Sequence, residues 1–485
     1  MTKANTMTST TIKKISALPS PQEHWLKGSL GNFQPEQLHT YLYAKASELG
    51  AIFKVRMLTK PLVVISQPAT VQAILKQRPS RYRRVNQMES VFKEMGLHGV
   101  FSAEGKQWQE YRQLMNPVFK PSHIKRMLPT IHKITQRFRD AVAQQPEQID
   151  IQALLKKLLV DITSELAFGY DLNTLANDNA GLQGHLSFIF SNIGRRTKSP
   201  IPYWRYIKSA KDKQLEKSLA ITRNEIQSFI NTRKQELKST EETNNILDAL
   251  LLAKDENGQP YSDDVIYGNV LTLLLAGEDT TANTLAWTLY FLSQDLPLQE
   301  KVQQEITANY PADGKLTWES LDNFPLTFAA CQESMRMQPT APFLFLEPLN
   351  DETILGHHIP AGTTVVLLLN SGAHNTELFP NPEQFIPERW LNFSAEQKKQ
   401  SAAELAPFGG GARLCPGMQL SLIEQKITLI ELLRDFKIEL NNGGKPVNSC
   451  YRFAVMPDNL IVNAVKQKTT YGKSQPATKV EAAPA

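Results

Sequence analysis

The residues best suited to do chemistry lie in one loop, Phe408 to Gly417, which contains Cys415. Three consecutive glycines permit backbone angles closed to other residues, so the loop can lie flat against a bulky planar group, and Gly417 leaves room for one. A helix with an apolar stripe is predicted next, over 418–434. A cysteine before a helix has a lowered pKa, because the helix dipole favours the thiolate, the form that binds iron. Arg413 offers a positive charge to a ligand carboxylate. The alternative is a structural cysteine beside a glycine-rich turn.

An acid and an alcohol, Asp279 and Thr280, lie within a helix predicted over 263–293, with Ser262 as its N-cap. This helix is apolar nearly all round at its centre, which predicts a path through the interior. A mid-helix glycine costs about 1 kcal/mol against alanine, and threonine hydroxyls that bond back to carbonyls loosen a helix, so we expect a small groove. An acid and an alcohol facing it can relay protons to a bound oxygen species. A kink with a solvated acid is the alternative.

Two further pairs carry less information by themselves. Glu333 and Arg336 stand three residues apart on one helix face, which is common for a surface ion pair. Trp108 and Arg112 stand four apart, as in an ordinary amphipathic helix, although both side chains are hydrogen-bond donors only.

In order and spacing these motifs resemble the cytochrome P-450 family over residues 19–465. The loop matches the haem-binding signature of that family at Phe408, Gly411, Arg413, Cys415 and Gly417. The resemblance implies that the thiolate of Cys415 is the axial ligand of the haem iron, where its electron donation favours O–O cleavage. It also implies that Asp279 and Thr280 form the oxygen-activation motif.

The resemblance assigns the remaining residues as well. A structural triad that locks the loop behind the haem is expected from Glu333, Arg336 and Arg389. A haem propionate is expected to be held by Trp108, Arg112 and Arg413. The sequence departs from the family at residues 343–348, where many relatives carry another propionate-binding arginine and this chain has no basic residue.

The composition narrows the class of protein. The chain has 485 residues, 41% hydrophobic and 21% charged, with a formal net charge of +5. This small charge, without a basic run interleaved with aromatics, gives no reason to expect a nucleic-acid partner. Three scattered cysteines do not form a disulfide framework and suit a reducing compartment. No apolar segment is long enough for a membrane anchor, so we expect a cytoplasmic protein.

Helical periodicity dominates the chain. Further helices are predicted over 122–145, 150–168 and 212–238, strand pairs over 51–57 with 62–66 and 353–355 with 363–369, and a long loop over 375–410. With the resemblance, this predicts a mainly α cytochrome P-450 fold: one helix-rich domain over 16–465, with small β-sheets and a long central helix over the haem. Residues 1–15 and 466–485 are expected to be disordered.

The resemblance implies a haem-thiolate monooxygenase that binds haem b and activates O2. Electrons are expected from a separate ferredoxin- or flavodoxin-type donor with its reductase, so that NAD(P)H is used indirectly. The substrate is expected to be a lipophilic small molecule that is hydroxylated or epoxidised: a fatty acid, a terpenoid or a polyketide-like compound. Its pocket is expected to include Leu273, Ala276, Ala341, Phe343 and Phe453. A peroxide-driven or rearranging haem-thiolate enzyme and a non-enzymatic haem-binding protein are the alternatives.

Overall fold

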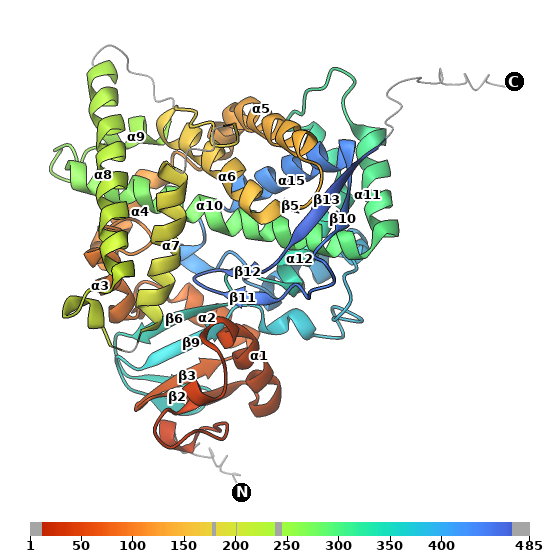
Figure 1. Ribbon diagram of the computed structural model, residues 1–485. Coiled ribbons are helices and arrows are strands. Elements are labelled where there is room, and N and C mark those ends of the chain that lie inside the picture. The colour runs from red at the N-terminus through yellow and green to blue at the C-terminus, as the bar shows by residue number, and fades with distance from the viewer. Residues whose placement is uncertain (1–11, 177–180, 200, 238–244, 468–485) are drawn as a thin grey trace, which may run out of the picture.

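A long central helix organises the molecule. The computed structural model describes residues 12–176, 181–199, 201–237 and 245–467. The longest helix in it, α10 (Asp263–Gln294), crosses the middle of the molecule, with most helices above it and a sheet below (Figure 1). Its side chains are buried on nearly every face, because its apolar residues leave no polar stripe for water. Ser262 is the N-cap residue, but its side chain accepts no capping hydrogen bond, contrary to the usual role of a serine there.

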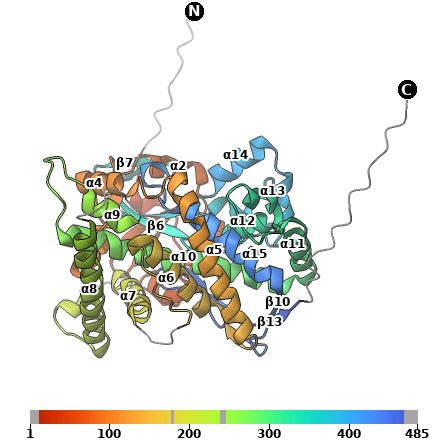
Figure 2. The same cartoon turned by 90° about the horizontal axis from the view of Figure 1, so that it is seen from above.

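The long helices predicted from periodicity are present. They are α5 (Pro121–Gln144), α6 (Ile151–Phe168), α8 (Ala210–Glu236) and α15 (Met418–Asp435). The other helices are α1 (Leu38–Leu49), α2 (Pro68–Lys76), α3 (Asn86–Glu94), α4 (Gly105–Met115), α7 (Leu182–Lys198), α9 (Ile246–Leu252), α11 (Leu296–Asn309) and α12 (Pro325–Met337). Figure 2 shows α5 and α15 running side by side, with α11 beside the end of α15.

The largest sheet has five strands in the order β2-β3-β9-β6-β4. They are β2 (Ile52–Met57), β3 (Lys60–Ile65), β4 (Tyr82–Arg84), β6 (Phe343–Pro348) and β9 (Thr364–Leu368). The predicted hairpin of β2 and β3 is present. Both faces of the sheet are covered: Val63 and Ile65 pack into one core cluster, and Leu62 and Val64 pack into another. Because both faces of β3 are buried there, its successive residues from Leu62 to Ile65 are apolar.

The second predicted strand pair is wrong in its pairing. β7 (Glu352–Ile354) pairs with β8 (His357–Ile359), whereas β9 joins the large sheet between β3 and β6. Order also begins before residue 16, because β1 (Lys13–Lys14) pairs in parallel with β8. Two smaller sheets contain β5 (Ile149–Asp150), β10 (Phe436–Leu440) and β13 (Ile461–Lys466), and β11 (Ser449–Tyr451) and β12 (Val455–Pro457). The rest of the two predicted disordered ends, 1–11 and 468–485, lies outside the described residues.

The predicted loop over 375–410 contains two short helices, α13 (Glu388–Asn392) and α14 (Ala395–Glu404). α14 begins with a capping box, in which Ser394 and Gln397 exchange side-chain and backbone hydrogen bonds. This local signal was present in the sequence, but the surrounding prolines and glycines obscured it.

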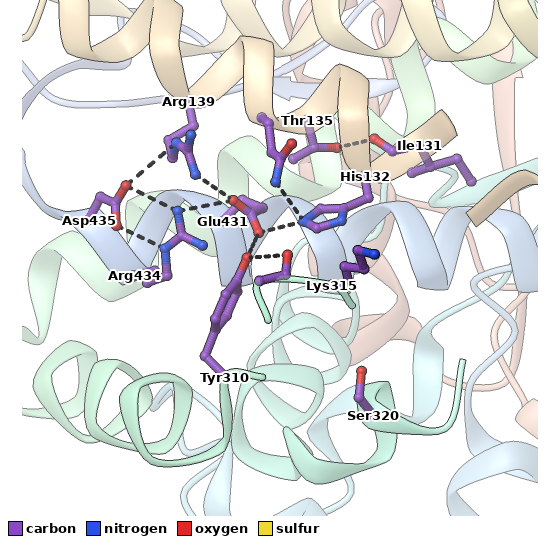
Figure 3. A network of polar contacts seen from close by, with 12 residues as sticks. Ile131, His132, Thr135, Arg139, Tyr310, Lys315, Ser320, Glu431, Arg434 and Asp435 are labelled. Atoms are coloured by element: carbon purple, nitrogen blue, oxygen red, sulfur yellow. Dashed lines mark hydrogen bonds and ion pairs between the residues drawn. The ribbon is translucent and has the colours of Figure 1, made fainter. Parts of the chain in front are cut away.

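A buried polar network joins α5, α15 and the end of α11 (Figure 3). Its centre is Glu431 of α15, which is fully buried and lies 2.8 Å from His132 Nε2, 2.5 Å from the Tyr310 hydroxyl and 3.0 Å from Arg139 Nη1. Burial by itself raises the pKa of Glu431, but these hydrogen bonds and the charge of Arg434 outweigh it and lower the pKa. The network holds α15, which follows the cysteine loop, against the rest of the helical layer.

Candidate functional site

The cysteine loop is closed by its own backbone. Cys415 N donates to Phe408 O at 3.0 Å, and a short 3-10 turn, Gly411–Arg413, lies between them. Gly411 has a φ of +63°, and a Cβ on it would lie 2.4 Å from Leu75 O of α2. This glycine is therefore required by the close packing of the loop on α2, and not only by a flat ligand. A Cβ on Gly417 would lie 4.0 Å from Cys415 Sγ, so any longer side chain there would grow beside the thiol.

The predicted lowering of the Cys415 pKa is wrong in sign. Burial raises the pKa of the thiol; the backbone N–H groups of Gly417 and Met418 and the charge of Arg112 lower it only in part. Desolvation of an anion outweighs a helix terminus when the surroundings are protein on all sides. Yet Cys415 itself is exposed. A cation bound beside this accessible thiol would restore the thiolate.

The centre of α10 also carries an accessible face. Ala276 is exposed, although its neighbours Leu275 and Glu278 are buried and the helix runs through the interior. Thr280, one turn further along, is partly exposed on the same helix face. Its Oγ1 donates to Ala276 O at 2.8 Å, which is the back-bond expected of this threonine. Leu273 lies one turn before Ala276 and is 8% exposed.

Gly277 lies where α6 packs closely on α10, and the groove expected at this point of α10 stays a prediction. The helix is continuous there, and a Cβ on Gly277 would lie 2.6 Å from Thr163 Oγ1 of α6. The glycine thus permits α6 to approach the centre of α10 closely. This approach brings Lys156 of α6 to Asp279: its Nζ lies 2.7 Å from Asp279 Oδ1, and the two side chains are 16% and 7% exposed. Lys156 was not identified from the sequence, because nothing near it in the chain marks its partner.

A cluster of buried arginines lies beside the loop. Arg413 Nη2 donates to Glu104 Oε2 at 2.6 Å and to Ala103 O at 2.8 Å, and its guanidinium lies 4.6 Å from the centre of the Trp108 ring. Arg78 lies 3.9 Å from Glu104, and Arg84 acts electrostatically on the same group of charges. Burial and mutual repulsion lower the pKa of Arg84 well below its ordinary value, with Glu104 opposing them. Three buried cations thus share one carboxylate.

This cluster is incompletely satisfied. Four buried nitrogens, Nε and Nη2 of Arg78 and Nε and Nη1 of Arg413, have no hydrogen-bond partner among the described residues. Unpaired buried guanidinium groups are costly unless an anion joins them. Arg112 lies close enough to Cys415 for each to shift the pKa of the other, so it borders the same space. Donors for carboxylates and an accessible cysteine together fit an iron-containing ligand with carboxylate arms.

The arginines supply what the 343–348 segment lacks. Arg84 of β4 pairs with Leu346 of β6 in the large sheet, so a basic residue stands on the neighbouring strand. Arg78 and Arg84 were not singled out from the sequence. The available signal was the density of arginine in residues 78–84, immediately before a strand.

Glu333, Arg336 and Arg389 come together in the structure. Arg336 donates to both carboxylate oxygens of Glu333, at 3.0 and 2.8 Å, and Arg389 Nε donates to Oε1 at 3.1 Å. Trp390 Nε1, which the sequence did not suggest, donates to Oε2 at 2.8 Å. The remaining guanidinium nitrogens donate to backbone carbonyls, among them Ala373 O at 2.8 Å. Every polar atom of these three charged side chains is satisfied.

The five residues expected to line a substrate pocket do not all lie together. Phe453 joins an aromatic cluster with Phe92, Phe101 and Phe190, with ring centres 5.1 to 6.1 Å from its own. Gly194 of α7 permits this arrangement, since a Cβ there would meet the backbone of Arg452 and Phe453. Ala276 is exposed, Leu273 nearly buried and Ala341 half-buried. Phe343 is 6% exposed and packs in a core cluster with Trp287 and Tyr451, so it serves mainly as core.

Comparison with known proteins identifies the family. The family model described as cytochrome P-450 matches residues 18–464. Abscisic acid 8'-hydroxylase 4 of Arabidopsis thaliana is 27% identical over 418 residues, 84% of this chain and 84% of the relative. Taurochenodeoxycholic 6 alpha-hydroxylase of Sus scrofa is 25% identical over 462 residues, 90% of this chain and 88% of the relative. The crystal structure of the cytochrome P-450DA haem domain superposes with a TM-score of 0.83 at 22% identity, over 93% of this chain and 97% of the other.

The chain therefore belongs to the cytochrome P-450 family and has its mainly α fold. It is a monooxygenase that uses haem b, O2 and electrons that come from NAD(P)H through partner proteins, and it acts on lipophilic compounds. In the part of the chain that the structure describes, no helix is both long and apolar enough to cross a membrane.

Proposed function

We propose that this protein hydroxylates or epoxidises a lipophilic small molecule in the internal cavity between Cys415 and the centre of α10. The observation that carries the proposal is that two residues of the interior, Cys415 and Ala276, are both exposed. The cavity they face has a thiol on one wall and a small residue, which leaves room for a substrate, on another.

The haem supplies the activation of O2 and the transfer of one oxygen atom to the substrate. In our proposal Cys415 would bind its iron, with Phe408, Gly411 and Gly417 shaping the loop. The unpaired nitrogens of Arg413 and Arg78 would hold its carboxylate arms, with Arg84, Arg112 and Trp108 nearby. Bidentate guanidinium groups are well suited to carboxylates, and their burial strengthens the interaction.

Asp279 and Thr280 handle protons at the face of α10 that carries Ala276. The Thr280 hydroxyl donates to Ala276 O at 2.8 Å, which leaves its oxygen free to accept a hydrogen bond on the cavity side. Asp279 is held by Lys156 at 2.7 Å and can carry a proton from the outer side of α10 to Thr280.

The electron donor, in our proposal, is a separate protein of the ferredoxin or flavodoxin type with its own reductase. We place the protein in the cytoplasm because its cysteines, Cys331, Cys415 and Cys450, are all free, which suits a reducing compartment. Two relatives whose names specify hydroxylation of abscisic acid and of a taurine-conjugated bile acid support a hydroxylation of a lipophilic acid or terpenoid.

The test is a screen of fatty acids, terpenoids and polyketide-like compounds for the change of haem spin state that follows displacement of water from iron. Compounds that bind are then incubated with O2 and an electron-donor system, and separately with peroxide alone. An oxygenated product that requires O2 and electrons supports the proposal. Product from peroxide alone would favour a peroxide-driven enzyme, and the absence of any product from all binding compounds would contradict oxygen insertion.

A further inference from the structure

Glu278, the residue before Asp279, is a buried acid that the proposed chemistry has not used. It lies on α10 and is 1% exposed. Its Oε1 accepts hydrogen bonds from Ser187 Oγ at 2.6 Å and from Gln183 Nε2 at 3.3 Å, both on α7. Its Oε2 is buried and has no hydrogen-bond partner among the described residues. Burying a carboxyl group with one unpaired oxygen costs folding free energy.

The two successive acids of α10 face two different helices. Asp279 faces Lys156 of α6, while Glu278 faces the uncharged donors Ser187 and Gln183 of α7. The charged groups that act on Glu278 are Asp279 and, more weakly, Lys156. One cation therefore serves two buried carboxyl groups. A single negative charge is favoured, and two are not.

Burial and the charge of Asp279 raise the pKa of Glu278 to about 8, against the lowering effects of Ser187 and Lys156. At neutral pH Glu278 thus carries a proton. Because Ser187 and Gln183 both donate to Oε1, the proton resides on Oε2, which has no acceptor to hold it. The same two donors are in place to stabilise Glu278 once it has lost that proton.

We propose that Glu278 is a proton reservoir that recharges Asp279 during turnover, an inference that rests on the proposed function. A proton passes from the Glu278 carboxyl to the Asp279 carboxylate, so the negative charge moves from Asp279 to Glu278. Lys156 and the α7 donors balance that charge in either position. Asp279 gives its proton to Thr280 as Glu278 takes one from water through Ser187, which is partly exposed, so the cluster keeps one negative carboxylate throughout. Glu278 acts only through Asp279 and does not contact the substrate.

The variant Glu278→Gln tests this in the haem-loaded full-length enzyme with its electron donor. Glutamine keeps a carbonyl oxygen for Ser187 and Gln183 and removes only the proton that titrates. We expect substrate binding and the reduced carbon-monoxide spectrum to be unchanged. The fraction of NAD(P)H converted to product should fall several-fold, with peroxide released instead, and the solvent isotope effect on kcat should rise.

The pH dependence of product formation per NAD(P)H is a second test. In the wild type, the coupling, which is the fraction of NAD(P)H converted to product, should be high at neutral pH. It should decline as pH rises through about 8, where Glu278 loses its proton. In Glu278→Gln the decline should be absent and the coupling low throughout. Ser187→Ala removes both a donor to the anion and the proposed route for its proton, so the coupling should fall and the decline should move to higher pH. This variant also serves if Glu278→Gln does not fold. Glu165→Gln, the same change at a half-buried acid of α6, is the matched control and should match the wild type.

If Glu278→Gln keeps the coupling, isotope effect and pH profile of the wild type, Glu278 is only a tie between α10 and α7, and the inference is wrong. If Glu278→Gln folds poorly and Ser187→Ala leaves the pH profile unmoved, the inference is also wrong. A wild-type enzyme without a thiolate carbon-monoxide spectrum or O2-dependent product would instead overturn the proposed function, and the reservoir with it.

Discussion

The two buried clusters of arginine and glutamate, around Glu333 and around Glu104, are built differently. Around Glu333, two arginines and a tryptophan donate to one carboxylate, and the remaining guanidinium nitrogens reach backbone carbonyls. Around Glu104, three arginines surround one carboxylate, and four of their nitrogens have no hydrogen-bond partner among the described residues. The first cluster is complete by itself, whereas the second has surplus donors that only an added anion can satisfy.

The difference separates a structural role from a binding role without reference to any relative. A complete buried network fixes one arrangement of the chain, here the segment 380–390 against α12. An incomplete network leaves buried positive charge unpaired, and the carboxylates of a ligand can pair with it. Four predictions are ordered from the largest expected effect to the smallest; three test this comparison, and one tests Glu424, a buried acid outside both clusters.

Glu333→Ala should have the largest effect. It would leave Arg336 and Arg389 buried without their counter-charge, which costs roughly 3–5 kcal/mol of folding free energy. We expect little folded protein at 37 °C, measured by urea denaturation and by haem content. If the variant melts within a few degrees of the wild type, the Glu333 cluster is not the lock that we describe.

Glu424→Gln should remove a pH dependence of stability. Glu424 is 3% exposed, and burial raises its pKa from 4.5 to about 8, opposed by a hydrogen bond to Thr281. Since the folded state keeps its proton and the unfolded state loses it, the wild type should lose about 1.4 kcal/mol of stability, relative to the variant, for each pH unit between about 4.5 and 8. Melting temperatures of both proteins at pH 5 and pH 8 measure this. A constant difference would show that Glu424 is ionised in the fold.

Arg413→Ala should impair ligand binding more than folding. Its loss breaks the ion pair with Glu104, but Arg78 and Arg84 still accompany that carboxylate, so folding should suffer less than in Glu333→Ala. Haem should be released about tenfold faster, equivalent to about 1.4 kcal/mol, because two nitrogens of Arg413 have no hydrogen-bond partner among the described residues. Transfer of haem to a scavenger protein measures the rate, with circular dichroism as the control for folding. Unchanged release together with a large loss of folding would place Arg413 with the complete cluster.

Trp390→Phe should have the smallest effect. It deletes one donor to Glu333 and keeps the ring, while both arginines still satisfy the carboxylate. We expect a loss of about 1 kcal/mol in urea denaturation, and no change in haem release. A change in haem release would show that the two clusters are coupled.

The sequence predicted those features of the fold that depend on a local pattern of residues. The long helices follow from their apolar period, and the cysteine loop follows from its glycines and the helix after it. The pairing of β9 with β3 could not be predicted, because the two strands are about 300 residues apart in the chain. The helices within 375–410 are short, and the prolines around them hide their caps.

The site residues that the sequence did not reveal were missed for the same reason, which is that their partners lie far away in the chain. Lys156, Arg78 and Arg84 acquire their roles from partners on distant elements, and no spacing within the chain marks them. The sign of the Cys415 pKa shift depends on how much protein surrounds the thiol, whereas the sequence showed only the helix terminus. Gly277 also has a role that the sequence did not show, because it leaves room for Thr163 of α6.

The central claim is that Cys415 binds haem iron as a thiolate in this cavity. The most direct test is the reduced, carbon-monoxide difference spectrum of the purified protein, beside that of Cys415→Ala. We predict a strongly red-shifted Soret band in the wild type and its loss in the variant. A wild-type band typical of imidazole- or thiol-ligated haem, in protein shown to be folded, would contradict the claim, as would a folded protein that takes up no haem on reconstitution.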